Sequence, residues 1–329
     1  MIRPAGLVLS CVLLAGVSQI EAQVQAQAQA QVQMPSLNGT WKAGKPLDVP
    51  RNEVALTAVG GKVYVVGGNI GGNAVPRIDE YEPLADVWKA RAPMPQGLDH
   101  LGLAVIGSRI YTVGGFVGSV HRGAVDALYR YDHNADTWET LAPMKAPRAS
   151  VGVAVLDGKI HAIGGRGVDN TVTVATHEVY DPRTNKWTDA APLPKARDHM
   201  AVVAADGKIH AIGGRVTNPA SRVADHDIYD PKTNTWAAGP PLPTARSGLA
   251  HALYQGMIVV LGGELPPDTF AENEAFDPRS GKWRTLAPMP AGRHGTGAAV
   301  LGKNLYVAAG SLKPGSGDVT SQMIVFTMP

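Results

Sequence analysis

The segment that decides the fold is ARDHMAVVAADGKIHAIGGRVTNPASRVADHDIYDPKTNTW, residues 196–236. It contains a strand of small and branched residues, a tight turn at Asp206-Gly207-Lys208 and an apolar strand that ends at Gly213-Gly214. A Tyr-Asp-Pro turn and Trp236 follow. Short apolar runs rich in branched residues and bounded by turn residues are typical of β-strands. The segment therefore predicts four successive strands.

The same pattern occurs six times along the chain, which indicates a repeat protein. Tryptophans recur at intervals of 47 to 50 residues, at positions 41, 88, 138, 187, 236 and 283. A glycine pair, Ala-Gly in the last unit, begins 26 residues after each tryptophan. Twelve residues before each pair only glycine or alanine is found, at Ala55, Gly102, Gly152, Ala201, Ala250 and Gly297. Such small side chains predict a strand that is crowded near an axis.

These units of about 50 residues, each with a double glycine, an aromatic-Asp-Pro turn and a fixed tryptophan, resemble the kelch repeat of β-propellers. The resemblance covers residues 36–329 and implies an all-β, six-bladed kelch β-propeller with four antiparallel strands per blade. The sixth unit ends at Pro329 before any tryptophan, whereas Trp41 has no unit before it. We therefore expect the N-terminal strand to close the last blade, which removes an open sheet edge.

The first residues predict export. Arg3 precedes an apolar run over residues 5–17, which is the layout of a signal peptide and too short to span a bilayer. We assign residues 1–22 to this signal peptide, residues 23–35 to a Gln/Ala low-complexity linker and residues 36–329 to the propeller. Cys11, the only cysteine, leaves lipidation as an alternative to simple export. We expect a periplasmic or secreted protein with no membrane span.

The charge balance excludes one class of partner. The chain has 30 basic and 28 acidic residues, and a binder of nucleic acid needs a clustered cationic surface. We therefore expect no nucleic-acid partner. No cofactor motif or convincing acid–base pair is evident, so our leading hypothesis is a monomeric, non-catalytic recognition module without cofactor or metal. Its ligand would be a protein, a peptide or an anionic glycan.

An arginine recurs sixteen residues before the glycine pair in five of the six units. The residues at this position are Arg51, Leu98, Arg148, Arg197, Arg246 and Arg293. All six lie at the entry to the first strand, on the face where the loops vary in length. One interpretation is that the guanidinium groups bind an anionic ligand at the channel mouth. The alternative is an architectural role, in which each arginine pairs with an acidic residue or a loop carbonyl and holds the blades together.

Three histidines depart from the repeat. His251 takes a first-strand position that holds an apolar residue in the other units, so its imidazole either faces the channel or finds a partner in the core. His161 and His210 replace tyrosines of the second strand, and we interpret them as packing residues. We place the tryptophans in the core.

Two enzymatic alternatives remain open. Exported kelch proteins include sialic-acid mutarotases, and a sugar-acid isomerase of this kind would need an arginine for the carboxylate and a nearby His199 or Glu264. The series Glu264, Asp268 and Glu272 resembles the E-x3-D-x3-H iron site of plant specifier proteins, with glutamate as the third residue. This resemblance implies a metal-assisted lyase as the other alternative.

Overall fold

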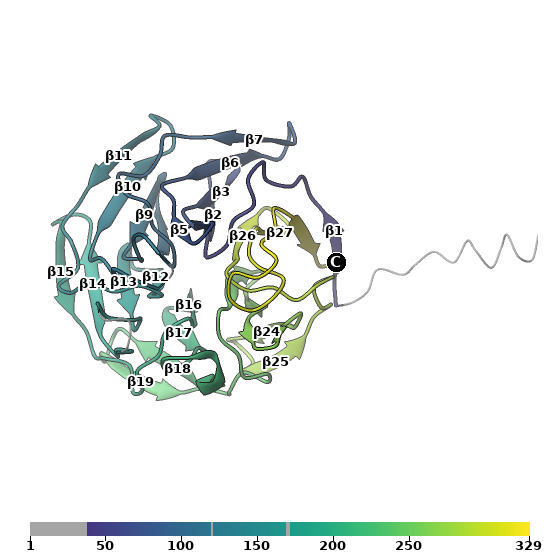
Figure 1. The fold of residues 1–329 in the computed structure, drawn as a ribbon. Helices are drawn as coiled ribbons and strands as arrows, with labels where there is room; N and C mark the ends of the chain where they lie inside the picture. The colour runs from purple at the N-terminus through teal and green to yellow at the C-terminus, as the bar shows by residue number, and fades with distance from the viewer. Residues whose placement is uncertain (1–37, 120, 169–171) are drawn as a thin grey trace, which may run out of the picture. The chain divides into compact units, whose positions relative to one another are not determined.

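The computed structural model describes residues 38–119, 121–168 and 172–329. Asn38–Met328 form one compact unit that contains six four-stranded antiparallel sheets around a central axis (Figure 1). The predicted all-β, six-bladed architecture is confirmed. The signal peptide and the linker predicted for residues 1–35 lie outside the described residues.

Within each blade the first strand lies innermost and the fourth outermost (Figure 1). Blade 1 contains β2 (Ala55–Val59), β3 (Lys62–Val66), β6 (Ile78–Glu82) and β7 (Val87–Ala90). Blade 2 contains β8 (Gly102–Ile106), β9 (Arg109–Val113), β10 (Leu128–Asp132) and β11 (Thr137–Thr140). Blade 3 contains β12 (Gly152–Leu156), β13 (Lys159–Ile163), β14 (His177–Asp181) and β15 (Lys186–Asp189).

The other three blades repeat this order. Blade 4 contains β16 (Ala201–Ala205), β17 (Lys208–Ile212), β18 (His226–Asp230) and β19 (Thr235–Ala238). Blade 5 contains β20 (Ala250–Tyr254), β21 (Met257–Leu261), β24 (Asn273–Asp277) and β25 (Lys282–Thr285). Blade 6 contains β26 (Gly297–Leu301), β27 (Asn304–Ala308), β28 (Met323–Thr327) and, from the other end of the propeller, β1 (Thr40–Ala43).

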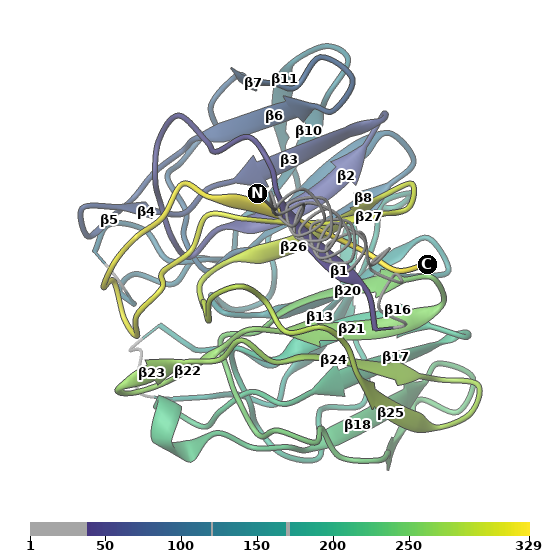
Figure 2. The ribbon, with the colours of Figure 1, turned by 90° about the vertical axis from the view of Figure 1, so that its right-hand side faces the viewer.

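The loops between the second and third strands carry additional short elements. These are the hairpin of β4 (Asn69–Ile70) and β5 (Asn73–Ala74), the hairpin of β22 (Glu264–Leu265) and β23 (Asp268–Thr269), and the 3₁₀ turn η1 (Pro219–Ser221). Figure 2 shows both hairpins on the same side of the ring. In every blade the segment before the first strand pairs with the residue after the glycine pair, so these two regions share one face, as predicted.

The described residues include no helix that is long and apolar enough to cross a membrane.

The innermost strands are as crowded as their small residues predict. A Cβ atom added to Gly102 would lie 2.2 Å from Cγ2 of Val153 in the next blade. One added to Gly152 would lie 2.1 Å from Cγ2 of Val202. Real Cβ atoms do not approach so closely, so glycine allows neighbouring first strands to meet around the axis.

The glycine pairs join neighbouring blades. The N–H of the second glycine donates to a carbonyl of the next blade, for example from Gly165 to Arg197 O. The acceptor is always the residue at the position of the recurrent arginine, and the bond is 2.9–3.0 Å long at all six boundaries. The bond from Gly310 to Arg51 O closes the ring. The first glycine is left-handed, and a Cβ on Gly164 would lie only 2.4 Å from Arg197 O. Backbone conformation and the close approach of the next blade therefore both favour glycine, although blade 6 has Ala309 at this position with a φ of 63°.

The outer strands are joined by their tryptophans. β1 pairs with β28, and the rings of Trp41 and Phe326 lie 4.9 Å apart, which confirms the predicted closure of blade 6. Each indole N–H also donates to a carbonyl of the preceding blade or of the segment that leaves it, over 2.8–3.0 Å; the acceptors are Ala287, Lys45, Ala92, Ala142, Ala191 and Pro240. We expected the tryptophans to lie in the core. They are half-buried instead, and they pack against the core clusters without being fully enclosed.

His161 and His210 form matching imidazole pairs in blades 3 and 4. His161 Nδ1 donates to His177 Nε2 over 2.9 Å, and His177 Nδ1 donates to the carbonyl of Ala191 over 3.1 Å. His210, His226 and Pro240 O repeat the arrangement one blade later. Because the carbonyl can only accept, it fixes the tautomers of both rings. All four imidazoles are buried, in agreement with the packing role predicted for His161 and His210.

Candidate functional site

A ring of six equivalent residues surrounds the opening of the central channel. They stand fourteen positions before each glycine pair and are Glu53, His100, Ser150, His199, Gly248 and Gly295. All six have a left-handed backbone, with φ between 50° and 72°. Backbone hydrogen bonds connect neighbours in this ring, for example from Ser150 N to His100 O over 2.9 Å. The ring borders a cavity of about 160 Å³, whose wall is formed by first-strand residues of five blades and, in blade 4, by Met200 just before β16.

Two histidines of this ring are oriented by the aspartate that precedes each of them. His100 Nδ1 lies 2.8 Å from Asp99 Oδ1, and His199 Nδ1 lies 2.5 Å from Asp198 Oδ1. Both aspartates are completely buried. A carboxylate can only accept, so each imidazole donates through Nδ1 and leaves Nε2 for other contacts. Blades 2 and 4 thus hold the same aspartate–histidine pair at the same repeat position.

His121 joins these two imidazoles from the loop between β9 and β10. Its Nε2 lies 3.1 Å from His100 Nε2. The ring centroid of His199 lies 5.0 Å from that of His100 and 5.7 Å from that of His121. Phe116 packs edge-on against His100 and His121 and forms an apolar wall behind them. One nitrogen from each of the three imidazoles can be chosen so that all lie within 4.8 Å of one another.

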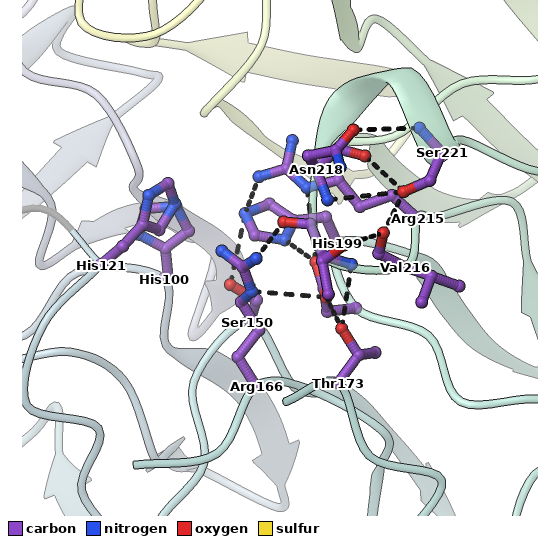
Figure 3. Close-up of polar contacts among 12 residues, drawn as sticks. His100, His121, Ser150, Arg166, Thr173, His199, Arg215, Val216, Asn218 and Ser221 are labelled. Atoms are coloured by element: carbon purple, nitrogen blue, oxygen red, sulfur yellow. Dashed lines mark hydrogen bonds and ion pairs between the residues drawn. The ribbon is translucent and has the colours of Figure 1, made fainter. Parts of the chain in front are cut away.

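Two arginines lie beside His199 and Asp198. Arg166 and Arg215 each follow directly on a glycine pair, and both are buried. Arg215 donates to Glu264 Oε1 over 2.7 Å and to His199 Nε2 over 2.9 Å. Asp198 lies near both guanidinium groups, 3.5 Å from Arg166 Nε and 3.4 Å from Arg215 Nε. Figure 3 shows His199 among these arginines, with His100 and His121 beside each other to one side of this group.

The surroundings shift the pKa values of the imidazoles in opposite directions. Burial disfavours a charged His100, but Glu53, 3.0 Å from its Nε2, and Asp99 outweigh burial and raise its pKa. Burial lowers the pKa of His199 far below its usual range, and the Arg215 guanidinium lowers it further. Burial and the charge of His100 also lower the pKa of His121. His199 and His121 are therefore neutral at pH 7.

The five arginines predicted from the repeat do not lie in this opening. Arg51, Arg148, Arg197, Arg246 and Arg293 are at most 1% exposed. Each donates to the carbonyl of the first residue of its own glycine pair, over 2.8–3.2 Å. Four of them also pair with an acidic residue of the third strand, at Asp79, Glu178, Asp227 and Glu274. These contacts match the architectural alternative, whereas contact with a ligand stays an untested prediction.

The other predicted residues have separate locations. His199 and Glu264 both lie at the opening and are joined through Arg215. His251 faces the channel, where its Nδ1 has no hydrogen-bond partner and burial lowers its pKa to about 4. The series Glu264, Asp268 and Glu272 forms no common ligand set: within the part of the chain that is described, only His100, His121 and His199 come close enough together to share an ion. The three ligands that the lyase alternative would need are therefore not brought together in the described residues.

Several residues of the opening were not singled out by the sequence. They are Glu53, Asp99, His100, His121, Arg166, Asp198 and Arg215. A signal was present, since Asp-His stands at the same repeat position in residues 99–100 and 198–199, and Gly-Gly-Arg in residues 164–166 and 213–215. The position that lines the channel opening is two residues beyond the recurrent arginine.

A ring of four-stranded blades around a channel with a polar opening defines the β-propeller class of repeat proteins. Within that class, the family model described as "Kelch motif" matches the chain at residues 50–95, 100–145, 147–194, 196–243 and 245–290. The chain belongs to the kelch-repeat family.

Comparison with individual proteins adds support for the fold. No curated protein matches the sequence. Among solved structures, the one titled "Structure of YjhT" superposes with a TM-score of 0.72 and 17% sequence identity. The match covers 85% of this chain and 95% of the other. At this identity the likeness concerns the propeller architecture alone.

Proposed function

We propose that the protein is an exported recognition module that binds a sugar or sugar acid at the channel opening. The observation that carries this proposal is the collection of buried donors and acceptors around one hollow. Glu53, Ser150 and His199 line the hollow itself. The buried pair of Arg215 and Glu264 adds a donor and an acceptor directly behind His199, to which Arg215 donates. Hydroxyl groups both donate and accept, and a carboxylate pairs with a guanidinium. Apolar side chains just before the first strands, such as Leu101 and Val151, offer an apolar floor for the ring of a sugar.

The surface argues for a small ligand over an extended protein partner. The exposed large apolar side chains of the described residues are Leu84, Val168, Val172 and Leu253. Val168 and Val172 belong to the loop between β13 and β14 of blade 3, whereas Leu84 and Leu253 belong to blades 1 and 5, so the four form no series along one element. Sites for protein partners usually present a contiguous apolar patch. Among the partners that the sequence left open, a glycan therefore has the strongest support.

Calorimetric titration tests the proposal with N-acetylneuraminate, glucuronate, galacturonate and the uncharged parent sugars. We expect binding of at least one acid. The double variant Arg215→Gln with Glu264→Gln removes the ion pair without leaving a buried charge unpaired, and should weaken binding more than tenfold. Arg183→Gln, which changes a largely exposed arginine in the turn between β14 and β15, is the matched control. Failure of the folded wild-type protein to bind any of these sugars would reject the proposal.

A second function, sugar-acid isomerase, is favoured by one observation. The Arg215 guanidinium donates hydrogen bonds to both residues that such an enzyme would use, to His199 Nε2 over 2.9 Å and to Glu264 Oε1 over 2.7 Å. The arginine would bind the carboxylate, and Glu264 would accept the proton of the anomeric hydroxyl while the bond between the anomeric carbon and the ring oxygen breaks and water gives the ring oxygen a proton. Reclosure on the other face of the carbonyl would return both protons. NMR measurement of anomer exchange in N-acetylneuraminate tests this function. We expect an accelerated exchange that Glu264→Gln abolishes, whereas a rate equal to that in buffer excludes the isomerase.

Export and a monomeric state belong to the same proposal. The basis for export is the apolar run over residues 5–17 behind Arg3. N-terminal sequencing of the protein from a periplasmic or culture fraction should begin after residue 22. Recovery of the uncleaved chain from the cytosol would contradict export. Light scattering should give a mass near 34.5 kDa or slightly less, and a mass twice as large would contradict the monomer.

A further inference from the structure

We propose that His100, His121 and His199 bind one divalent transition-metal ion of the kind that prefers imidazole, such as Zn²⁺ or Cu²⁺. This inference goes beyond the proposed function and departs from the metal-free protein expected from the sequence. The three residues are far apart in the chain, but one nitrogen of each lies within 4.8 Å of the other two. Among the described residues this is the one set of His, Cys, Asp or Glu with such geometry.

The spacing of the nitrogens fits an ion. With Zn–N bonds of about 2.05 Å in tetrahedral geometry, two ligand nitrogens are separated by about 3.3 Å. His100 Nε2 and His121 Nε2 lie 3.1 Å apart, close to this value. His199 belongs to blade 4 and is the more distant member, so a movement of about 1–2 Å completes the set. Such a shift is within reach of side-chain rotation.

The residues behind the imidazoles are those of a metal site. Imidazoles that bind a metal usually donate their other N–H to a carboxylate or a carbonyl, which fixes the tautomer and orients the ring. Asp99 accepts from His100 at 2.8 Å, and Asp198 accepts from His199 at 2.5 Å. Both carboxylates are fully buried, so they belong to the interior and not to a solvated acidic surface. The aspartates thus leave Nε2 of both rings for other contacts, with His121 at His100 and with Arg215 at His199.

The contacts of the Nε2 atoms suggest how the ion would be accommodated. Glu53 Oε2 lies 3.0 Å from His100 Nε2 and is placed to become a fourth ligand. Arg215 donates to His199 Nε2 and would release this bond, while keeping Glu264 as its partner. Without Glu53, the fourth position would open into the channel, where a ligand or water could reach it. The nearby carboxylates of Glu53, Asp99 and Asp198 compensate the charge of the ion.

Metal analysis of the full chain tests the inference, after removal of any histidine purification tag. Protein dialysed against Zn²⁺ or Cu²⁺ and then against metal-free buffer should retain one ion per chain. Co²⁺ should give the intense visible absorption of a tetrahedral site with nitrogen ligands. His100→Ala with His199→Ala should lower the affinity more than a hundredfold. His161→Tyr, which removes a buried histidine outside the opening and restores the residue type of blade 2, should retain full binding.

A positioning variant separates this site from adventitious binding. Asp198→Asn keeps all three ligands but removes the carboxylate that orients His199, and should lower the affinity 10–100-fold. Folding of each variant is checked by its melting temperature. Absence of a retained ion in the folded wild-type protein overturns the inference, as does equal retention by the double histidine variant. Sugar titration with and without a chelator is a separate readout, so the metal site and the sugar site can fail independently.

Discussion

The guanidinium of Arg148 donates to the carboxylate of Glu178 over 2.6 Å in the interior of blade 3, where both side chains are almost completely buried. In blade 2 the equivalent positions hold Leu98 and Tyr129, so the loss of the arginine is matched by the loss of the acid. A charge left alone in the interior is costly, whereas a buried ion pair replaced as a whole can be nearly neutral. In blades 1 to 5 the two positions therefore vary as a unit, whereas blade 6 keeps Arg293 with Ile324 at the acidic position and Gln322 as its side-chain partner.

This relationship predicts the effect of separating the pair. Arg148→Leu should lower the free energy of unfolding by about 3–5 kcal/mol, because Glu178 is left buried without its counter-ion. Arg148→Leu combined with Glu178→Tyr, the combination found in blade 2, should recover most of the loss. Denaturant unfolding of the two variants measures both values. An unchanged stability of the single variant, together with lost sugar binding, would instead support a ligand role for Arg148.

The glycine pairs predict a difference between two similar substitutions in blade 3. Gly164 and Gly158 both have a left-handed backbone, with φ of 62° and 72°. A Cβ on Gly164 would lie 2.4 Å from Arg197 O, whereas one on Gly158 meets no atom within 4 Å. Gly158→Ala should cost only the conformational strain, about 1–2 kcal/mol. Gly164→Ala should cost clearly more, because the next blade must move.

Melting temperatures of the two alanine variants measure this difference. Gly158→Ala is the internal control, since it carries the same conformational penalty in the same blade. Equal losses would show that the contact between Gly164 and the next blade does not limit the packing of the ring.

The sequence predicted the fold well because its constraints recur in every blade. The clash beside Gly164 and the indole bond of Trp187 have equivalents throughout the ring, so the same residue types return at fixed spacing. The N-terminal closure followed from the missing tryptophan of the last unit. Repetition therefore exposes what the architecture requires.

The site was predicted less well because its residues, unlike those of the architecture, do not recur in every blade. Recurrence directed attention to Arg148 and its equivalents, which serve the architecture, whereas the channel-facing position two residues further on differs between the blades. His199 and Glu264 were included, but His100 was not, because a left-handed backbone is not visible in the sequence at a non-glycine residue. The contribution of His121 depends on a loop that brings it back to His100, and no repeat position indicates this contact.

The paired imidazoles of blades 3 and 4 predict a loss of stability in mild acid. Burial lowers the pKa of His161 to about 3 and those of His177, His210 and His226 to about 4. In the unfolded chain these groups titrate near 6.5. Below that pH the unfolded chain binds more protons than the folded one, so stability is complete above about pH 6.5 and falls as the pH approaches 4. Each unit by which the pKa differs between the folded and the unfolded chain changes the free energy of unfolding by up to about 1.4 kcal/mol.

Thermal unfolding between pH 4 and pH 7 measures this effect. The variant His161→Tyr with His177→Leu gives blade 3 the residues of blade 2, Tyr111 and Leu128. It should lose less stability between pH 6.5 and pH 4 than the wild-type protein does. A wild-type melting temperature that stays constant over this range would contradict the neutral, buried state of the pairs.

Ring closure predicts that Trp41 differs from its equivalents. Its indole packs on Phe326 and donates to Ala287 O over 2.9 Å, and its strand β1 is connected to no other strand of blade 6 by a hairpin. Trp41→Ala should therefore release β1 and leave β28, with the sequence MIVFT, as an open apolar edge. The equivalent change Trp187→Ala leaves β15 attached to β14 through a short turn. Both variants should melt earlier, but only Trp41→Ala should aggregate below its melting temperature.

Light scattering on heating and amide hydrogen exchange distinguish the two variants. In Trp41→Ala the amides of Met323–Thr327 that face β1 should exchange much faster than in the wild-type protein, because opening of the blade no longer requires global unfolding. In Trp187→Ala the protection of β14 should decrease only in proportion to the overall loss of stability. If Trp41→Ala retains the protection of β28, then β1 is held by its backbone pairing alone and the indole is not needed to close the ring.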